Sequence, residues 1–270
     1  MEQYSVLMSV YIKEKPEYLK QSIESILNQT VKTDDFWIVC DGPLTKELDL
    51  VLEEFEKENQ KCLHILRLEE NVGLGKALNA GLKQCKHSIV ARMDSDDISC
   101  EDRCEKQLEV IEQGVDIVSG TVMEFEKDIH EYLTKRELPL CHKEIMKFAA
   151  RRNPFNHPCV MYRKESVQSA GGYQHFYLFE DYYLWARMLL HGAIGRNLPD
   201  VLLYMRAGAD MYRRRGGWKY VKSMFHFRFY LWKSGICSFK DFFITAGGQM
   251  IICLVPNCMR EMFYKKYLRK

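Results

Sequence analysis

The sequence has no pair of cysteines at the C-x-x-C spacing, although it contains 10 cysteines in 270 residues. The two nearest in sequence are Cys100 and Cys104. This spacing gives no support for a zinc ribbon, a thioredoxin-like redox pair or a disulfide framework. Strand-like sequence already starts at Ser5 with no secretory leader before it, so we expect reduced thiols and a cytoplasmic protein.

The sequence also lacks a run of about 18 uninterrupted apolar residues, the length that a membrane-spanning helix requires. Its most apolar segment, residues 242–256, is interrupted by Gly247, Gly248 and Gln249. Internal repeats are absent, and 47% hydrophobic and 28% charged residues are ordinary values for one large globular domain with a small appendage. The apolar segment precedes several lysines and arginines, so it is either a packed terminal helix or a segment in a membrane interface.

Negative charge is scarce at the C-terminal end. Residues 201–270 contain 14 Lys and Arg against 3 Asp and Glu, a net charge of +11, whereas residues 1–200 carry about −9. A basic end of this kind suits a phosphorylated substrate, a lipid headgroup layer or nucleic acid, and charge alone does not distinguish them.

Apolar runs and helical patterns alternate along the chain, which predicts an α/β fold with a parallel sheet covered on both faces. The expected strands are residues 5–11, 36–40, 63–68, 88–92, 117–122 and 157–162. The expected helices are residues 16–28, 46–59, 75–85, 143–150 and 180–190.

Three carboxylates follow the fourth strand, in Asp94-Ser95-Asp96-Asp97. Because carboxylates this close repel one another, a hard divalent cation such as Mg²⁺ or Mn²⁺ is expected among them. The alternative is that Ser95 or Asp97 caps a helix beginning near Glu101. The strand ends Ser9-Val10-Tyr11 and Asp41-Gly42 should meet the acidic cluster at one sheet edge, which favours a binding site.

A glycine-rich phosphate loop is missing. Gly73-Leu74-Gly75 lacks the third glycine of a dinucleotide fingerprint and follows Asn71 rather than a strand, so we exclude a dinucleotide-binding Rossmann enzyme.

The order of motifs resembles a family 2 glycosyltransferase with the GT-A fold, of the bacterial capsule or exopolysaccharide type, from about Ser5 to at least Gly217. The matching segments are Ser5-Val-Leu-Met-Ser-Val-Tyr11, Cys40-Asp41-Gly42, Asn71-Val-Gly-Leu-Gly-Lys76-Ala-Leu-Asn79-Ala-Gly81, Arg92-Met-Asp94-Ser-Asp96-Asp97 with Arg103 and Gln107, and Glu180-Asp181 with Trp185 and Arg187.

The resemblance implies a Rossmann-like, mostly parallel central sheet with flanking helices and a C-terminal helical appendage. Residues 1–205 would form the GT-A domain, with a nucleotide-binding half at about 1–100 and an acceptor-binding half at about 101–205. Residues 206–270 would form a basic, largely helical extension that is a candidate for membrane association. Acceptor loops are expected at residues 123–154 and after Leu198.

A UDP-sugar donor with Mn²⁺ or Mg²⁺ is also implied by the resemblance. Asp96 and Asp94 would hold the metal, Asp94 would also hold the ribose, and Asp41 would accept a hydrogen bond from uracil. The full set implied for nucleotide-sugar binding is Ser9, Tyr11, Glu14, Asp41, Lys76, Asn79, Arg92, Asp94, Ser95, Arg213 and Arg214. Lys76 is alternatively a solvated helix lysine, and the arginines alternatively form a solvated loop or contact anionic lipid. Ile12 departs from the family, which often has asparagine there.

For catalysis, the resemblance implies Asp181 as general base, with Glu180 as second choice, in an inverting single displacement. By themselves, two carboxylates at a helix N-terminus equally fit a favourable interaction with the helix dipole. His157 and Trp185 would contact the acceptor, although His157 also fits a hydrogen-bonded structural histidine.

The Q-x-x-R-W motif of processive members is absent, which favours the transfer of a single sugar. We therefore expect an enzyme that adds one hexose or N-acetylhexosamine to a lipid-linked or oligosaccharide acceptor in surface polysaccharide synthesis. It would bind no nucleic acid and would lie peripherally at the inner face of the cell membrane. The alternatives are a non-catalytic nucleotide-sugar-binding module of the same fold and a sugar nucleotidyltransferase.

Overall fold

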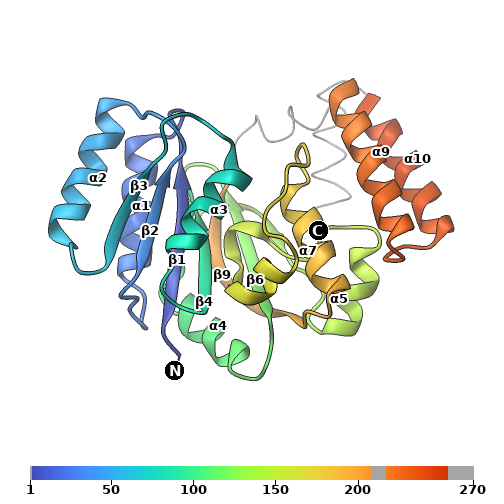
Figure 1. Cartoon of the computed structure of the whole chain (residues 1–270), viewed down its shortest axis with the longest axis horizontal. Helices are drawn as coiled ribbons and strands as arrows, with labels where there is room; N and C mark the ends of the chain where they lie inside the picture. Colours follow the sequence, from blue (N-terminus) through green and yellow to red (C-terminus); the bar gives the residue numbers. More distant parts are fainter. Residues whose placement is uncertain (1, 208–216, 255–270) are drawn as a thin grey trace.

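The computed structural model describes residues 2–207 and 217–254, with side chains through Met250 (Figure 1). Its first half alternates strands and helices as predicted. The elements are β1 (Tyr4–Val10), α1 (Pro16–Leu27), β2 (Phe36–Cys40), α2 (Lys46–Glu58), β3 (Leu63–Arg67), α3 (Leu74–Gln84) and β4 (Ile89–Asp94).

These four strands are parallel and follow the order β3-β2-β1-β4. Their register places Ser9 beside Asp94 and Val10 beside Cys40. The polar residues that end β1, β2 and β4 therefore meet at one edge, as the sequence predicted. This edge is the ordinary position of a ligand site in an open parallel sheet.

The second half makes the sheet mixed. Its elements are β5 (Ile98–Ser99), α4 (Arg103–Ile111), β6 (Ile117–Phe125), β7 (Tyr132–Arg136), α5 (His142–Ala149), a 3₁₀ turn η1 (His157–Cys159), β8 (Met161–Arg163), α6 (Lys164–Ser169), α7 (Glu180–Leu190) and β9 (Gly195–Arg206). The sheet continues from β4 through β8, β6 and β9 to β5, with β7 paired to β6. Strand β8 is antiparallel to both β4 and β6, whereas β6 and β9 are parallel. The predicted fold class is confirmed, with its parallel character concentrated in the first half.

The prediction of a strand over residues 157–162 is largely wrong. Pro158 has no backbone N–H to give to a sheet, and a tight turn forms instead with the Cys159 N–H donating to the Asn156 carbonyl at 2.8 Å. Strand β8 begins only at Met161.

Strand β9 was not predicted, because we expected acceptor loops after Leu198. The segment 197–200 contains polar residues and Pro199, which hide the apolar pattern, and the register shifts where the strand passes Gly120 and Thr121. The expected loop region 123–154 likewise contains β7 and α5.

Two helical layers enclose the sheet. Helices α1, α2 and α4 share a hydrophobic cluster with one side of β1, whereas α3, α5, α6 and α7 pack on the opposite side. The alternation of β1 explains this division, because Val6 and Met8 face the first layer and Leu7 faces the second.

Helices α9 (Trp218–Lys233) and α10 (Phe239–Leu254) form an antiparallel pair at the end of the molecule opposite α2 (Figure 1). They join a third hydrophobic cluster whose members on α7 include Tyr182 and Ala186. Within residues 2–207 and 217–254, no helix combines the length and the hydropathy needed to cross a membrane.

Gly81 allows α3 to approach the sheet closely. A Cβ atom at this position would overlap with Leu7 Cδ1 and Val39 Cγ2, both of them buried in the core. Gly75, in the first turn of the same helix, has room, since its Cβ would meet Tyr173 Cβ at 3.4 Å.

We therefore predict that Gly81→Ala lowers the free energy of unfolding by about 1–3 kcal/mol, because overpacked cores must shift to accept a methyl group. Gly75→Ala is the matched control and should be neutral or stabilising by up to about 1 kcal/mol, since alanine favours a helix. Urea denaturation of both variants measures the difference. Equal stability of the two would contradict the proposed close packing at Gly81.

Candidate functional site

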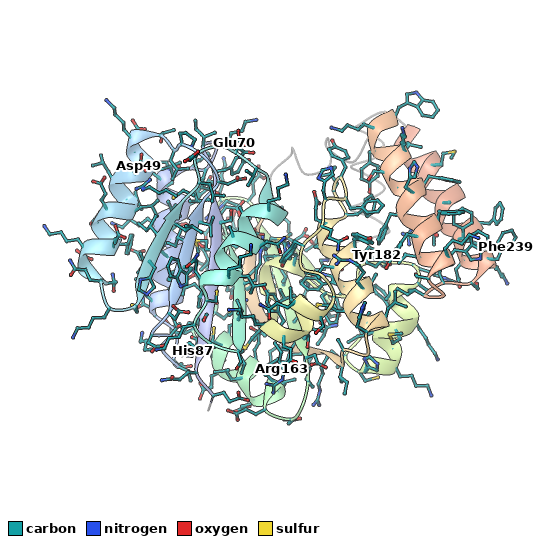
Figure 2. All side chains as sticks on the ribbon, in the orientation of Figure 1. Asp49, Glu70, His87, Arg163, Tyr182 and Phe239 are labelled. Atoms are coloured by element: carbon teal, nitrogen blue, oxygen red, sulfur yellow. The ribbon has the colours of Figure 1, made fainter. Side chains whose placement is uncertain are left out.

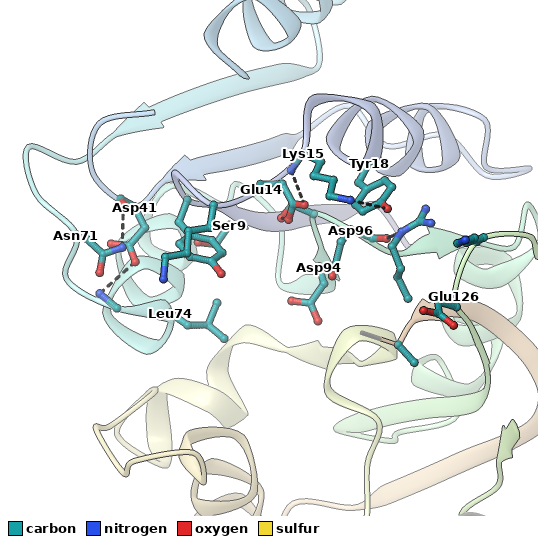
Figure 3. Close-up of a pocket in the computed structure, with 17 residues that line it drawn as sticks. Ser9, Glu14, Lys15, Tyr18, Asp41, Asn71, Leu74, Asp94, Asp96 and Glu126 are labelled. Carbon is teal, nitrogen blue, oxygen red and sulfur yellow. Dashed lines mark hydrogen bonds between the residues drawn. The ribbon is translucent and has the colours of Figure 1, made fainter. Parts of the chain in front are cut away.

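A cavity of about 890 Å³ opens at the edge where β1, β2 and β4 end (Figure 3). Asp41 and Asn71 lie at one end of it, Glu126 lies at the other, and Asp94 and Asp96 lie between them. The cavity is lined by Ser9, Tyr11, Lys13, Glu14, Lys15, Tyr18, Asp41, Asn71, Gly73, Leu74, Asp94, Ser95, Asp96, Glu126, Lys127, Arg206 and Ala207. Seven of the predicted donor and metal residues are in this set: Ser9, Tyr11, Glu14, Asp41, Asp94, Ser95 and Asp96.

Asp94, Asp96 and Asp97 bring one carboxylate oxygen each to within 4.8 Å of the others. Burial raises the pKa of Asp96 to about 7, and repulsion by Asp94 and Glu14 adds to the shift. Burial and repulsion by Asp96 also raise the pKa of Asp97 well above its usual range. Three oxygen donors crowded this closely fit a hard divalent cation, whose positive charge would offset their repulsion.

The acidic loop is held from several sides. The Arg92 Nη2 donates to Asp94 Oδ1, and the Ser22 Oγ donates to the Asp94 carbonyl at 2.8 Å. The Ser95 Oγ donates to Glu14 Oε2 at 2.6 Å. These contacts fix the carboxylates close together despite their repulsion.

The interpretation of Asp97 or Ser95 as a helix cap is wrong. Helix α4 begins at Arg103 with Asp102 before it, and the two-residue strand β5 separates it from the acidic cluster. Asp97 Oδ1 instead accepts from the Arg206 backbone N–H at 2.8 Å. Its Oδ2 is buried and has no hydrogen-bond partner among residues 2–207 and 217–250.

At the other end of the cavity, Asp41 organises the loop between β3 and α3. Its two carboxylate oxygens accept from the backbone N–H groups of Val72 at 2.7 Å and Gly73 at 3.1 Å. The Asn71 Nδ2 donates to the Asp41 carbonyl at 3.1 Å. A carboxylate offers about four acceptor positions, so Asp41 retains capacity for a ligand donor.

Three residues predicted to bind the donor are not on the cavity wall. Lys76 is exposed on α3. Asn79 joins α3 to the loop before α7, since its side chain bonds both the N–H and the carbonyl of Tyr173 at 2.8 and 2.7 Å. Arg92 is buried behind Asp94, with its Nε and Nη1 unpartnered. For Asn79 and Arg92 the contacts indicate positioning of neighbouring groups.

Glu180 and Asp181 occupy the first turn of α7, outside the set that lines the cavity. The Asn153 Nδ2 donates to Asp181 Oδ2 at 2.6 Å, which orients this carboxylate. Burial raises the pKa of Glu180.

His157 and Trp185 do not line the cavity either. The His157 Nε2 lies 3.0 Å from the Tyr173 hydroxyl, and burial holds the pKa of this histidine well below its usual range. Trp185 is 0% exposed and packs against Phe155 and Tyr162, and its contact with an acceptor stays a prediction.

Sequence reasoning missed Arg206, which ends β9 and lines the cavity. Its guanidinium lies 3.7 Å from the Tyr18 ring centroid and 4.5 Å from that of Phe125, and its Nε donates to the Asp96 carbonyl at 3.0 Å. A cation at the end of a strand would have been a signal, but the strand itself was not recognised. Arg213 and Arg214 lie outside the described residues.

Solved structures share this architecture. One is the mannosyltransferase PcManGT from Pyrobaculum calidifontis in complex with GDP-Man and Mn²⁺, with a TM-score of 0.67 at 14% identity over 96% of this chain and 72% of that one. Another is S. aureus TarS 1–349 in complex with UDP-GlcNAc, with a TM-score of 0.62 at 16% identity over 98% of this chain and 71% of that one. At these identities the likeness shows the fold alone.

Relatives are similar over nearly their whole length. The amylovoran biosynthesis glycosyltransferase AmsE of Erwinia amylovora is 42% identical over 97% of this chain and 98% of its own. The UDP-Gal:alpha-D-GlcNAc-diphosphoundecaprenol beta-1,3-galactosyltransferase of Escherichia coli is 37% identical over 99% of this chain and 97% of its own. The model of glycosyl transferase family 2 matches residues 5–171. This chain therefore belongs to glycosyl transferase family 2.

Proposed function

We propose that this family 2 glycosyltransferase transfers one sugar, with inversion and with a divalent metal, from a UDP-sugar to a lipid-linked or oligosaccharide acceptor in surface polysaccharide synthesis. The observation that carries the proposal is one cavity that has Asp41 at one end, Glu126 at the other, and Asp94 and Asp96 of the acidic cluster between them. The similarity to a galactosyltransferase named for UDP-Gal and a diphosphoundecaprenol-linked GlcNAc supports the donor and acceptor classes.

Asp96 and Asp94 are the residues proposed to hold Mn²⁺ or Mg²⁺. A bound cation would neutralise the charge that develops on the diphosphate leaving group. Asp41 would accept from the base and Asp94 from the ribose, while Ser9, Tyr11, Glu14 and Ser95 line the same cavity. Arg206 is added to this set, because it lines the cavity and its Nε donates to the Asp96 carbonyl at 3.0 Å.

Asp181 is proposed as the general base. The acceptor hydroxyl oxygen would form the new bond to the anomeric carbon as the bond to the UDP oxygen breaks, and its proton would pass to the carboxylate. Asn153 supports this assignment. Its Nδ2 donates to Asp181 Oδ2, which orients the carboxylate, and this hydrogen bond leaves Oδ1 to accept the proton. Glu180 is the second choice for this role.

The location is proposed from the acceptor. A lipid-linked acceptor would place the enzyme peripherally at the inner face of the cell membrane, and the transferred sugar would be a hexose or N-acetylhexosamine. We retain the division into a GT-A domain at 1–205 and a basic extension at 206–270 as part of this proposal. Release of UDP, rather than pyrophosphate, from a UDP-sugar with Mn²⁺ would distinguish this function from nucleotidyl transfer, and turnover would distinguish it from mere binding.

A metal held by Asp96 should make the stability of the protein depend on pH. The pKa of Asp96 is raised to about 7, so ionising this carboxyl lowers the free energy of unfolding of the metal-free protein. That free energy should therefore increase as the pH falls from about 8 towards 5. Mn²⁺ requires the ionised carboxylate, so the increase in Tm that Mn²⁺ gives should shrink over the same range. Thermal unfolding with and without Mn²⁺ at each pH measures both trends.

Asp96→Asn should raise the Tm of the metal-free protein at pH 8, by about 2–4 °C for each kcal/mol recovered, and should abolish the Mn²⁺ effect. Asp34→Asn is the control, since Asp34 is ion-paired with Lys86 and His87 and its pKa is lowered to about 2. It should give no increase in Tm. An undiminished Mn²⁺ effect in Asp96→Asn would contradict the metal assignment.

Loss of the Asp181 carboxylate should slow the chemical step. Asp181→Asn should lower kcat by about 10²- to 10⁴-fold, the usual contribution of a general base, while the KM for the UDP-sugar changes little. Asp200→Asn, which removes a carboxylate paired with Lys106 at 2.8 Å, should leave kcat unchanged. Initial rates of UDP release give both constants. Loss of less than tenfold in Asp181→Asn together with a larger loss in Glu180→Gln would transfer the role to Glu180.

A further inference from the structure

Helices α9 and α10 turn a row of apolar side chains toward solvent. Most of these side chains recur at intervals of three or four residues along their helix, which places them in a stripe on one face. We call this surface the outer aromatic face; it consists of Trp218, Phe225, Phe229, Phe239, Phe243 and Ile244. Each of these residues is between 42% and 76% exposed.

The face is continuous across the two helices. The Trp232 ring lies 5.5 Å from that of Phe229 on α9 and 5.4 Å from that of Phe239 on α10. The Phe239 and Phe243 rings are 4.6 Å apart. In Figure 2, Phe239 lies at the outer edge of the helix pair, away from Tyr182. Exposed apolar surface that is contiguous across two elements marks an interaction site more often than scattered residues do.

The charges around this face have one sign. Lys222, Lys233 and Lys240 are all exposed on the same two helices. Lys219 instead extends over the Tyr177 ring, with its Nζ 4.2 Å from the ring centroid. Lys233 extends along the face, with its Nζ 4.9 Å from the Trp232 ring centroid. The one acidic residue in the sequence of α9 and α10, Asp241, is already bound by Arg151 at 2.6 Å.

We propose that the outer aromatic face docks this enzyme onto an anionic lipid bilayer. Aromatic rings and lysines together are the composition that favours a membrane interface, where the rings enter the headgroup boundary and the cations meet lipid phosphates. A second copy of the chain fits less well, because a twofold contact would set these lysines against one another with no free carboxylate from either helix.

The inner side of the same helix pair is connected to the proposed acceptor side. The Phe227 ring packs 4.9 Å from that of Phe179 and 4.6 Å from that of Tyr182, which flank Glu180 and Asp181 in the chain. The Arg228 Nη2 donates to the Arg151 carbonyl at 2.7 Å, two residues before Asn153. Docking would thus hold the candidate base near the bilayer surface, a consequence that rests on the proposed function.

Vesicle sedimentation of the full chain tests the docking without donor, metal or acceptor. Binding should be strong to vesicles of phosphatidylcholine with phosphatidylglycerol and weak to phosphatidylcholine alone. Phe229→Ser with Phe243→Ser should lower the partition coefficient at least about tenfold, because the variant loses two rings that the bilayer would bury. Lys222→Gln and Lys233→Gln should each lower it about fivefold.

The matched control is Leu50→Ser with Ile194→Ser, which removes two equally exposed apolar side chains elsewhere, at 64% and 47% exposure. It should bind as the unmodified chain does. Brominated lipids provide a second measurement, since they should quench the fluorescence of the unmodified chain and of Trp37→Phe but not of Trp218→Phe with Trp232→Phe.

Binding equal for both vesicle types, or unchanged in the Phe229→Ser and Phe243→Ser variant, would overturn the proposal. So would a dimer in light scattering that this variant dissociates without any vesicle binding by the unmodified chain. Release of UDP with a water-soluble acceptor analogue is scored separately. Vesicle binding without turnover would therefore count against the proposed function and leave the docking face intact.

Discussion

Repulsion among Asp94, Asp96 and Asp97 is the constraint on which the site depends. Three carboxylate oxygens within 4.8 Å of one another would separate if the backbone were free to move. The chain prevents this in two ways. The buried strand β4 ends at the half-buried Asp94, and the loop is held to α1 through Ser22 and to β9 through Arg206. Holding the carboxylates together lowers the free energy of unfolding, as burial and repulsion by neighbouring carboxylates raise the pKa of Asp96.

Buried side chains of α4 support β4, the strand that leads into the acidic loop. Arg103 on α4 donates from its Nη2 to the Arg92 carbonyl at 2.6 Å, and its Nε donates to Gln107 at 3.0 Å. Gln107 in turn donates to the Cys159 carbonyl at 2.7 Å. The buried Arg103 and Gln107 therefore link β4 to the η1 turn. Their place downstream of the acidic cluster in the family motif has a structural explanation, since they support the strand that carries the carboxylates.

The parts of the site that the sequence predicted are those encoded locally. Asp41 follows the apolar strand β2, the Asp94 cluster begins at the end of β4, which is apolar except for Arg92, and parallel topology alone brings such strand ends together. Arg206 could not be predicted in this way, because its strand contains Pro199 and pairs with β6 through two register shifts. The burial of Trp185 could not be predicted for a related reason. A motif gives its position on α7, but which face of that helix is buried depends on α3, α5 and β8 together.

Helix α7 connects the C-terminal helices to the rest of the fold. One side of α7 packs into the core of the sheet through Trp185 and Met188, and the other packs on α9 through Tyr182 and Ala186. Its first turn, which carries Glu180 and Asp181, is therefore enclosed by two apolar layers. The hydrogen bond from the Asn153 Nδ2 orients the Asp181 carboxylate there. The same packing leaves the opposite side of α9 exposed, where the outer aromatic face lies. In our proposals, one side of α9 supports the helix that carries the base and the other side docks on the bilayer.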